Sequence, residues 1–289
     1  MRLLVTGAAG MLGADIRRAG QYAGYELLLL DLPELDITDA AAVRALLEAE
    51  RPDAVINCAA WTDVDGAETH REQAYAVNAD GAGNLARAAA EIEAPMVHVS
   101  TDYVFDGRAP LDDAKRPRGY VESDPTGPRS VYGESKLAGE EQVLAASDRH
   151  AVARSSWLFG TGGPNFVDTM LTLAVERPAV RVVYDQVGCP TWTGHLAYGL
   201  LGLLFRQISG LVHLAGFGHI SWYGFAREIF RQAEVRCDVE AITSARLARP
   251  APRPVWSVLE SERDDIPPLP PWQDGLDGYL TARAGMMQA

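Results

Sequence analysis

Continuous apolar segments alternate with helical patterns through the first half of the chain. We expect strands at residues 2–5, 26–30, 54–57, 96–100 and 151–154. These segments are apolar throughout rather than at every second position, which is typical of parallel strands covered on both faces. Helical patterns separate them, at residues 11–22, 38–50, 66–92 and 131–146. The repeated order of strand and helix predicts an α/β fold built on a doubly wound parallel sheet.

The second half of the chain is more mixed. Helical patterns cover residues 165–174, 193–208 and 221–233, and residues 181–183 are predicted to form a strand. Ser221 is expected to cap the last of these helices, as Thr38 or Asp39 is expected to cap the helix over 38–50. The proline-rich segment from Arg249 is expected to be irregular, and residues 285–289 to be frayed. No sharp linker separates the two halves, so we predict a smaller C-terminal lobe interleaved with the sheet.

Residues 106–129 interrupt the pattern of strands and helices. They contain Pro110, Pro117, Pro125 and Pro128 together with several charged residues. Long segments of this kind in compact domains often carry function. Two interpretations stay open, a surface loop and a flap over a binding site.

Composition and charge exclude several classes of protein. The chain has 289 residues with 39 acidic and 26 basic side chains, a net charge of −13 that disfavours nucleic acid and anionic membranes as partners. The longest apolar run, residues 196–205, contains two glycines and is too short to cross a bilayer as a helix. The three cysteines form no CxxC pair, and the N-terminus begins with a strand pattern. We therefore expect a cytoplasmic protein that binds neither nucleic acid nor membrane.

A glycine-rich turn joins the first predicted strand to the first predicted helix. Its sequence is Gly7-Ala8-Ala9-Gly10-Met11-Leu12-Gly13. The first glycine permits the tight turn, the second lets the backbone approach a pyrophosphate, and the third allows close packing of the helix. Free N–H groups at the start of the helix can then bind the anion. The position of this turn directly after the first strand predicts a dinucleotide site.

Acidic residues follow the second predicted strand. Asp31 stands eighteen residues after Gly13, where a carboxylate can bind the adenosine 2′-hydroxyl of NAD and repel the 2′-phosphate of NADP. The alternative is that Asp31 only caps a turn. Asp36 and Ile37 are candidates to line the adenine, although a helix cap also explains this segment.

Tyr132 and Lys136 are four residues apart in a helical pattern, which places both on one face of the helix. A nearby ammonium group is expected to lower the pKa of the phenol. Such a tyrosine can give a proton to a carbonyl oxygen while a hydride reaches the carbon. Thr101, at the end of the fourth predicted strand, can bind the same oxygen. The three residues predict a reductase site.

Segments along nearly the whole chain resemble one family. They are VTGAAGMLG from Val5, DITD from Asp36, INCAAWTDVDGAE from Ile56, VSTDYVFDG from Val99, VYGESKLAGE from Val131, RSSWLFGTGGPNFV from Arg154, DQVGCPTWTGHLA from Asp185, HLAGFGHISWYGFA from His213 and PRPVWSVLE from Pro252. The chain resembles the extended short-chain dehydrogenase/reductases and, within them, the dTDP-4-dehydrorhamnose reductase family.

The resemblance implies a reductase that converts dTDP-4-dehydro-β-L-rhamnose to dTDP-β-L-rhamnose with NADPH or NADH. Residues 1–155 would form the NAD(P)-binding Rossmann domain, and residues 156–289 mainly the substrate-binding lobe, with some segments returning to the first domain. Carried over by motif, Tyr132 is the proton donor, Lys136 holds the nicotinamide ribose, and Thr101 replaces the serine of most short-chain dehydrogenases.

The resemblance also implies further contacts. Cofactor contacts would come from the turn and the neighbouring strand ends, namely Gly7, Ala9, Gly10, Met11, Leu12, Gly13, Asp31, Asp36, Ile37, Ala59, Ala60, Tyr132 and Lys136, with Asn78 as weaker support. Substrate contacts would come from Thr101, Asp102, Tyr103, Trp157, Asn165 and Arg253. No metal ligand set is predicted from the histidines, and nothing catalytic is inferred from Cys58.

Other interpretations stay open. One alternative is a reductase of another dTDP-4-keto-6-deoxysugar. Another is a non-catalytic, NADP-binding regulatory subunit like that of methionine adenosyltransferase, which resembles the same family. A related epimerase or dehydratase is a third interpretation, of which the dehydratase is disfavoured because Tyr103 stands where dehydratases usually carry Glu. A homodimer is one candidate assembly. The aromatic residues Trp222, Tyr223 and Phe225 are interpreted as lobe core in preference to an interface.

Overall fold

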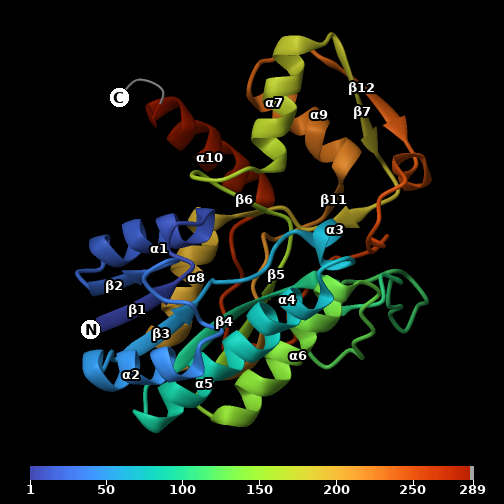
Figure 1. Cartoon of the computed structure of the whole chain (residues 1–289). Coiled ribbons are helices and arrows are strands. Elements are labelled where there is room, and N and C mark those ends of the chain that lie inside the picture. Colours follow the sequence, from blue (N-terminus) through green and yellow to red (C-terminus); the bar gives the residue numbers. More distant parts are fainter. Residues whose placement is uncertain (287–289) are drawn as a thin grey trace.

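A six-stranded parallel sheet lies at the centre of the molecule (Figure 1). The computed structural model describes residues 1–286. The strands follow the order β10-β5-β4-β3-β1-β2, and every neighbouring pair is parallel. Their bounds are β1 Arg2–Thr6, β2 Glu26–Leu30, β3 Ala54–Asn57, β4 Met96–Thr101, β5 Ala151–Ser155 and β10 Gly210–His213. The predicted doubly wound α/β sheet is confirmed, and β10 adds a strand from the second half of the chain.

Helices cover both faces of the sheet, which explains why its strands are apolar at every position. One face packs against α1 Met11–Tyr22 and α8 Thr193–Phe205. The other packs against α2 Ala40–Glu50, α5 Ala82–Glu91 and α6 Val131–Ala146. Asp39 caps α2 by accepting hydrogen bonds from Ala41 N and Ala42 N, so the second of the two predicted caps is the correct one.

The helix predicted over residues 66–92 is divided into four parts. These are α3 Val64–Ala67, α4 Arg71–Tyr75, the π-helical segment η1 Ala76–Gly81, and α5. Asp63 caps α3 by accepting from Gly66 N, and residues 68–70 separate α3 from α4. The π-helical segment contains Asn78, whose amide bonds to both backbone groups of Trp61. The extra residue of a π-turn is often found near functional sites.

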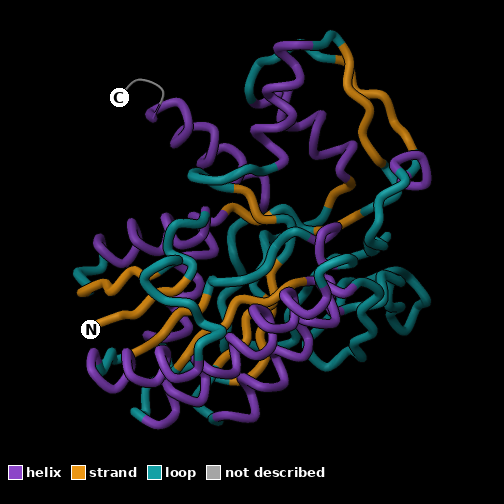
Figure 2. Tube along the Cα trace, in the orientation of Figure 1, coloured by secondary structure: helices purple, strands orange, loops and turns teal. Residues whose placement is uncertain are grey.

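The C-terminal lobe is a second layer of helices and short strands above the carboxyl ends of the sheet (Figure 2). Its core joins helices α7, α9 and α10 to strand β7. The elements of the lobe are α7 Phe166–Glu176, β7 Ala179–Val183, α9 Trp222–Gln232, β12 Asp238–Ile242 and α10 Trp272–Met286. Strands β7 and β12 pair within the lobe. Two further short pairings are β6 Leu158–Phe159 with β9 Thr191–Trp192, and β8 Val187–Gly188 with β11 Ile220–Ser221. The short helices η2 Asp102–Val104 and η3 Ser244–Leu247 complete the described elements.

The prediction that the segment from Arg249 is irregular is wrong for the last part of that segment. Residues 272–286 form α10, because Trp272, Leu276 and Tyr279 recur at helical spacing and are buried in the lobe core. The fraying expected for residues 285–289 is wrong at 285 and 286, which are helical, and residues 287–289 lie outside the described part. The strand β12 was not predicted, and the helix expected over 193–208 ends at Phe205. Ser221 caps α9 as predicted.

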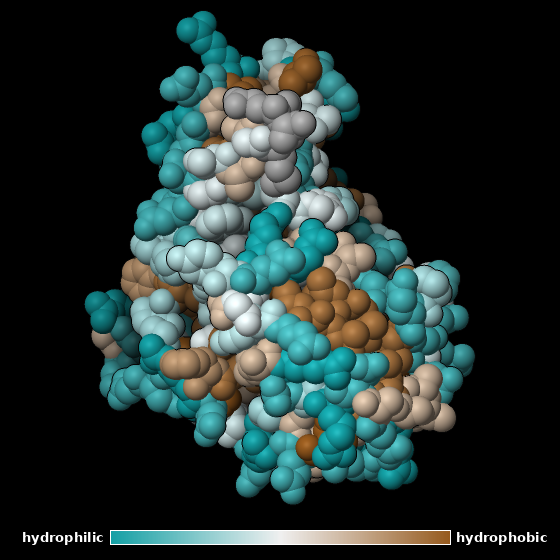
Figure 3. Space-filling view, turned by 90° about the vertical axis from the view of Figure 1, so that its left-hand side faces the viewer, coloured by the Kyte–Doolittle hydropathy of each residue, from teal (hydrophilic) through white to brown (hydrophobic). Residues whose placement is uncertain are grey.

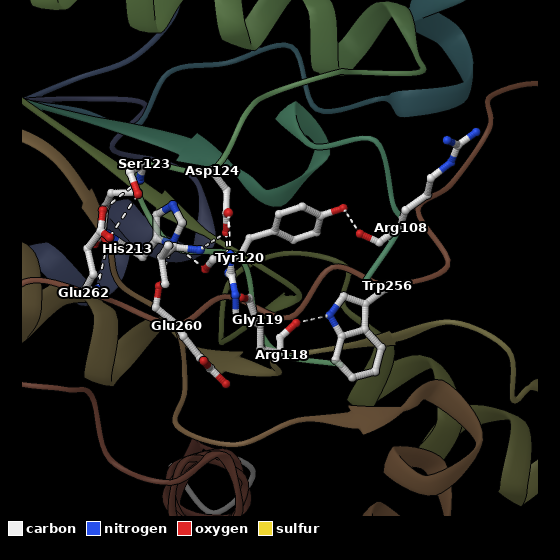
Figure 4. A network of polar contacts seen from close by, with 12 residues as sticks. Arg108, Arg118, Gly119, Tyr120, Ser123, Asp124, His213, Trp256, Glu260 and Glu262 are labelled. Atoms are coloured by element: carbon white, nitrogen blue, oxygen red, sulfur yellow. Dashed lines mark hydrogen bonds and ion pairs between the residues drawn. The ribbon is translucent and has the colours of Figure 1, made fainter. Parts of the chain in front are cut away.

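Residues 106–129 lie along residues 256–262 (Figure 4). Tyr120 N donates to Val258 O at 2.8 Å, and Glu260 N donates to Tyr120 O at 2.8 Å. The indole nitrogen of Trp256 donates to Arg118 O at 2.9 Å. None of residues 106–129 lines the cleft described below. The structure therefore favours the surface loop over the flap.

The side of the molecule on which β2 lies carries an apolar area at mid-height (Figure 3). Strand β2 is the edge of the sheet, and its leucines 27–29 are only partly buried. Within residues 1–286, no helix is both long enough and apolar enough to cross a membrane.

Candidate active site

The glycine-rich turn leaves no room for side chains at two of its three glycines. Gly7 has φ +68°, and a Cβ there would lie 2.6 Å from Ala59 N. A Cβ on Gly13 would lie 2.5 Å from Gly7 O. Gly10 is less crowded, with Gly7 O at 3.4 Å from its Cβ position, and no side chain caps the start of α1 at this residue. The backbone N–H groups at the start of α1 are thus open to an anion, which fits the pyrophosphate of a dinucleotide.

Asp31 is bound to the turn itself. Its carboxylate accepts from Ala9 N at 2.8 Å and from Leu32 N at 2.9 Å. Asp36 accepts from Thr38 N and Oγ1, and Ile37 is buried in the core. These side chains, with Ala9 and Ala59, stand outside the set of described residues that lines the main cleft.

A cleft of about 690 Å³ opens at the carboxyl ends of the strands. Gly7, Gly10, Met11, Leu12, Gly13 and Ala60 line it together with Thr101, Asp102, Tyr103, Tyr132, Lys136, Trp157 and Arg253. Thr101 ends β4, and Tyr132 and Lys136 lie on one face of α6, whose first turn is capped by Ser130. The structure thus brings the three predicted catalytic residues together with the phosphate-binding turn.

The pKa of Tyr132 is raised, not lowered as the sequence predicted. Burial raises it to about 12, the Thr101 hydroxyl lowers it, and the charge of Asp102 raises it further. Lys136 Nζ donates to Val99 O at 2.7 Å and lies 3.1 Å from His98 Nε2. The ammonium group that was expected to stabilise the phenolate is directed at these atoms. Tyr132 is therefore a neutral phenol over the physiological pH range, in the correct form to donate a proton.

Asp102 is a buried carboxyl group beside the catalytic threonine. Its side chain is 2% exposed, and burial raises its pKa to about 6. Thr101 Oγ1 donates to Asp102 Oδ1 at 3.1 Å. The other oxygen, Oδ2, has no hydrogen-bond partner among the described residues. A buried polar atom without a partner at the wall of a cleft is suited to bind a polar ligand.

Aromatic side chains form the wall opposite the turn. Tyr103 contacts Tyr132 edge to face, with ring centroids 5.4 Å apart. Trp157 and Trp222 stack in parallel with centroids 3.5 Å apart. Gly188 makes this stack possible, since a Cβ there would lie 2.5 Å from the Trp157 ring. Trp222, interpreted from the sequence as lobe core, packs against that core and also lines the cleft, and Phe225 is buried in the core.

A second cleft of about 680 Å³ adjoins the first. Both clefts are lined by Tyr103, Gln186, Trp222 and Arg253, so they are continuous. Arg253 Nη2 and Nη1 donate to the two oxygens of Asp65 at 2.8 and 2.9 Å. This pair lowers the pKa of Asp65 to about 2. Arg181 and Arg249 line the second cleft and were not predicted.

Two predicted residues serve the fold. Asn165 caps α7 by accepting from Asp168 N, and its amide nitrogen lies 3.1 Å from the Tyr279 hydroxyl. It is absent from the described lining of both clefts, which its neighbours Pro164 and Phe166 reach. Asn78 donates to Ser135 on α6 and so fixes the helix that carries the catalytic pair. The main cleft is also lined by Ser155, Gln186 and Pro254, which lie in segments that carry the family resemblance but were not assigned to the site from the sequence.

Metal ligands are not grouped in the part of the chain that the structure describes, where no cluster of three or more His, Cys, Asp or Glu is placed to hold an ion. Cys58 lies in the cleft wall near Lys136, and burial raises the pKa of its thiol to about 12. A thiol in this state is a poor nucleophile.

The chain matches one family over almost all of its length. The sequence profile described as the RmlD substrate binding domain matches residues 1–284. A dTDP-4-dehydrorhamnose reductase of Mycobacterium tuberculosis is 43% identical over 98% of this chain and 93% of its own. A Streptomyces antibioticus protein named "Probable dTDP-4,6-dihydroxy-2-methyloxan-3-one 4-ketoreductase" is 41% identical over 96% and 93% of the two chains. The crystal structure of dTDP-4-dehydrorhamnose reductase from Bacillus anthracis in complex with NADP is 35% identical, with a TM-score of 0.92 over 97% and 99%.

Proposed function

The chain belongs to the family of the RmlD substrate binding domain, and from this premise we propose that it reduces dTDP-4-dehydro-β-L-rhamnose to dTDP-β-L-rhamnose with NAD(P)H. The observation that carries the proposal is that Thr101, Tyr132 and Lys136 line the same cleft as the phosphate-binding turn. That cleft continues into a second one lined by arginines and aromatic rings, as an elongated nucleotide-sugar requires.

Gly7, Gly10 and Gly13 would hold the pyrophosphate of the cofactor, with Ala9, Met11 and Leu12 completing the turn. Asp31 would bind the adenosine ribose, with Asp36, Ile37, Ala59 and Ala60 beside the adenine and nicotinamide halves. The cofactor supplies a hydride to the C4 carbon of the sugar. The relative from Bacillus anthracis binds NADP, whereas the carboxylate of Asp31 favours NADH. We therefore propose that both cofactors serve.

The residues of the chain handle the proton. Tyr132 carries a proton on Oη that it would give to the C4 oxygen while the carbon is reduced, because its pKa of about 12 keeps the phenol neutral. Thr101 would bind the same oxygen through its hydroxyl. Asp102 is protonated below about pH 6 and can donate or accept a hydrogen bond on the sugar through Oδ2. Lys136 would supply the proton that returns Tyr132 to its neutral form.

The lobe would hold the sugar nucleotide. Trp157 and Tyr103 offer flat apolar faces to the sugar. Arg253 lines both clefts and would bind the diphosphate. Asn165 would act indirectly, by fixing the start of α7 beside the cleft. This gives a division in which residues 1–155 bind the cofactor and residues 156–289 mainly bind the substrate.

The direct test follows the absorbance of reduced nicotinamide in the presence of dTDP-4-dehydro-L-rhamnose. The proposal expects oxidation of NADH and of NADPH that depends on the keto-sugar. Absence of oxidation with either cofactor, in protein shown to bind the cofactor, would overturn it. That result would favour either a reductase of a different keto-sugar or the non-catalytic alternative, a regulatory subunit like that of methionine adenosyltransferase.

A second candidate is a reductase of another dTDP-4-keto-6-deoxysugar. The name of the Streptomyces antibioticus relative favours this candidate, since that protein is as similar to the chain as several rhamnose-forming relatives. The two candidates differ only in the sugar. Comparison of kcat/KM for dTDP-4-dehydro-L-rhamnose with that for other dTDP-4-keto-6-deoxysugars decides between them.

A further inference from the structure

A chain of buried polar side chains lies beneath the candidate active site. It runs from Thr6 on β1 through Asn57 on β3 and His98 on β4 to Lys136 on α6. Thr6 Oγ1 lies 2.8 Å from Asn57 Oδ1, Asn57 Nδ2 lies 3.0 Å from His98 Nδ1, and His98 Nε2 lies 3.1 Å from Lys136 Nζ. Each of the four residues is at most 2% exposed. Donors and acceptors must match in such a chain, because a buried mismatch is not relieved by water.

The side-chain amide of Asn57 has only one acceptable orientation. The backbone N–H of Ala59 points at one end of the amide, at 3.0 Å. A backbone N–H is always a donor, so this end is the carbonyl oxygen. The amide nitrogen of Asn57 therefore faces His98. The opposite orientation would set two donors against each other at Ala59.

The orientation of Asn57 fixes the tautomer of His98. Nδ1 faces an N–H donor and must accept, so the neutral ring carries its proton on Nε2. Burial holds the pKa of His98 well below its ordinary value, which keeps the ring neutral. Turning the ring over would present carbon atoms to Asn57 and Lys136 and leave buried nitrogens without partners.

The proton on His98 Nε2 points at Lys136 Nζ. An ammonium group has three donors and no acceptor, whereas an amine has a lone pair. Nζ also donates to Val99 O at 2.7 Å. Both contacts are satisfied together only when Nζ is an amine. We propose that His98 is a positioning residue that holds Lys136 as a neutral amine, and that protonation of Lys136 releases Nζ toward Tyr132 and the cofactor ribose.

The proton balance of this release is simple. The lone pair of Nζ takes a proton from water in the cleft, which Lys136 lines, and becomes an ammonium group. His98 keeps its Nε2 proton and loses its acceptor, so the two donors separate. The reverse step returns the proton to water. Neutral Lys136 is thus hydrogen-bonded to His98, and charged Lys136 acts in the cleft.

The other groups around Lys136 act in both directions. Burial lowers its pKa to about 8, while Glu140 on the next turn of α6 and Cys58 after β3 raise it. Tyr132 lies one turn earlier on α6 and lines the same cleft. The pKa of Lys136 therefore lies close enough to neutral pH for both forms to be populated. The catalytic meaning of the release rests on the proposed function, but the tautomer of His98 does not.

Nuclear magnetic resonance of ring-nitrogen-labelled histidine tests the tautomer directly. Two other buried histidines serve as internal standards in the same sample. His150 accepts from Met96 N at Nδ1 and faces Ala86 O with Nε2, so it carries its proton on Nε2. His213 faces the carbonyl oxygens of Tyr120 and Glu260 with Nδ1, so it carries its proton on Nδ1. At about pH 9, His98 is expected to match His150. A match to His213 would overturn the proposal.

A pH profile of kcat/KM tests the effect on Lys136. In His98→Gln the amide oxygen can accept from the ammonium group, so the alkaline limb is expected to move up by about one pH unit. His150→Gln is the matched control, because it removes a buried histidine directly before the neighbouring strand β5, away from the lining of the cleft. It should lose stability and keep the wild-type profile. A uniform loss of rate in His98→Gln, with an unmoved limb, would mean a merely structural role.

The two measurements separate the two proposals. If the protein reduces no keto-sugar but His98 carries its proton on Nε2, the proposed function fails. The proposal that His98 holds Lys136 as a neutral amine is then still supported. If His98→Gln does not fold, the resonance of wild-type His98 still decides the tautomer. The His98 signal is then assigned by elimination, from spectra of variants in which each of the other five histidines is replaced by Gln.

Discussion

The candidate site has a reaction end, at Thr101, Asp102 and Lys136, and a nucleotide end, at the second cleft. The side chains of these two ends are held in different ways. At the reaction end, Thr101, Asp102 and Lys136 are at most 6% exposed. Thr101 donates to Asp102, and Lys136 donates to Val99 O on β4. At the nucleotide end, Arg181 and Arg249 are exposed and Trp222 is half-buried. The difference indicates that polar side chains at the reaction end are placed by partners within the fold, whereas the side chains at the nucleotide end face solvent.

Removal of the proton donor at the reaction end should have the largest effect on kcat. Tyr132→Phe deletes one hydroxyl and is expected to lower kcat about a hundredfold to ten-thousandfold, with cofactor binding kept. Tyr120→Phe is the matched control, because its buried hydroxyl donates to Asp106 far along the surface loop. The control should lose stability and keep its rate. Steady-state kinetics of both variants check this, and a Tyr132→Phe enzyme of full rate would refute the assignment.

Asp102 should make stability depend on pH. Its pKa is raised from 3.8 to about 6, so the stability it contributes is present below about pH 4 and is lost as the pH rises through 6. In Asp102→Asn this loss is absent. The free energy of unfolding of the variant relative to that of the wild type should therefore rise by up to about 3 kcal/mol between about pH 4 and pH 7. Urea unfolding at the two pH values measures the difference.

Asp65→Asn gives the opposite sign and serves as the control for Asp102→Asn. The pKa of Asp65 is lowered to about 2, so its contribution is present above the unfolded pKa of about 4 and is lost as the pH falls. The Asp65→Asn variant should therefore lose stability relative to the wild type at neutral pH. The same trend in both variants would contradict the account of Asp102.

The nucleotide end should respond in KM and not in kcat. Arg253→Ala removes a charged donor and is expected to raise KM for the keto-sugar about ten- to hundredfold. Asp65→Asn leaves the guanidinium in place and frees it from its partner, so KM should not rise. A fall in kcat with unchanged KM in Arg253→Ala would move this residue from the nucleotide end to the reaction end.

The smallest expected effect concerns the choice of cofactor. Asp31→Asn keeps an acceptor but removes a negative charge, so the ratio of kcat/KM for NADPH over NADH should rise by about tenfold or less. Asp39→Asn, which changes the cap of α2, should leave the ratio unchanged. An unchanged ratio in Asp31→Asn would reduce Asp31 to a cap of the turn, where it accepts from Ala9 N.

The reaction end was the more predictable one from sequence, because its residues belong to local patterns. The turn from Gly7, the pair on α6 and Thr101 at the end of β4 each sit at a fixed offset from a predicted element. The nucleotide end is assembled from distant segments, and its members lack a shared spacing. Trp222 was assigned to the core because a tryptophan at helical spacing has the same pattern in a core and in a cleft wall.

Two further differences have physical causes. Helix α10 follows a proline-rich segment, and the prolines hid the helical spacing of Trp272, Leu276 and Tyr279. The pKa of Tyr132 was expected to fall because spacing places Lys136 nearby. Spacing does not report where Nζ points, and in the fold it is directed at His98 and Val99. Side-chain direction inside a buried network depends on partners from other strands.

Transfer of deuterium from reduced cofactor labelled at C4 of the nicotinamide tests the central claim most directly. The account predicts that the protein moves the label to C4 of the dTDP-4-keto sugar, that the label stays in the released dTDP-6-deoxysugar, and that one oxidised cofactor forms per product. A sugar product without deuterium, or a label that returns to the cofactor as in an epimerase or a dehydratase, would contradict the assignment of this cleft as a reductase site.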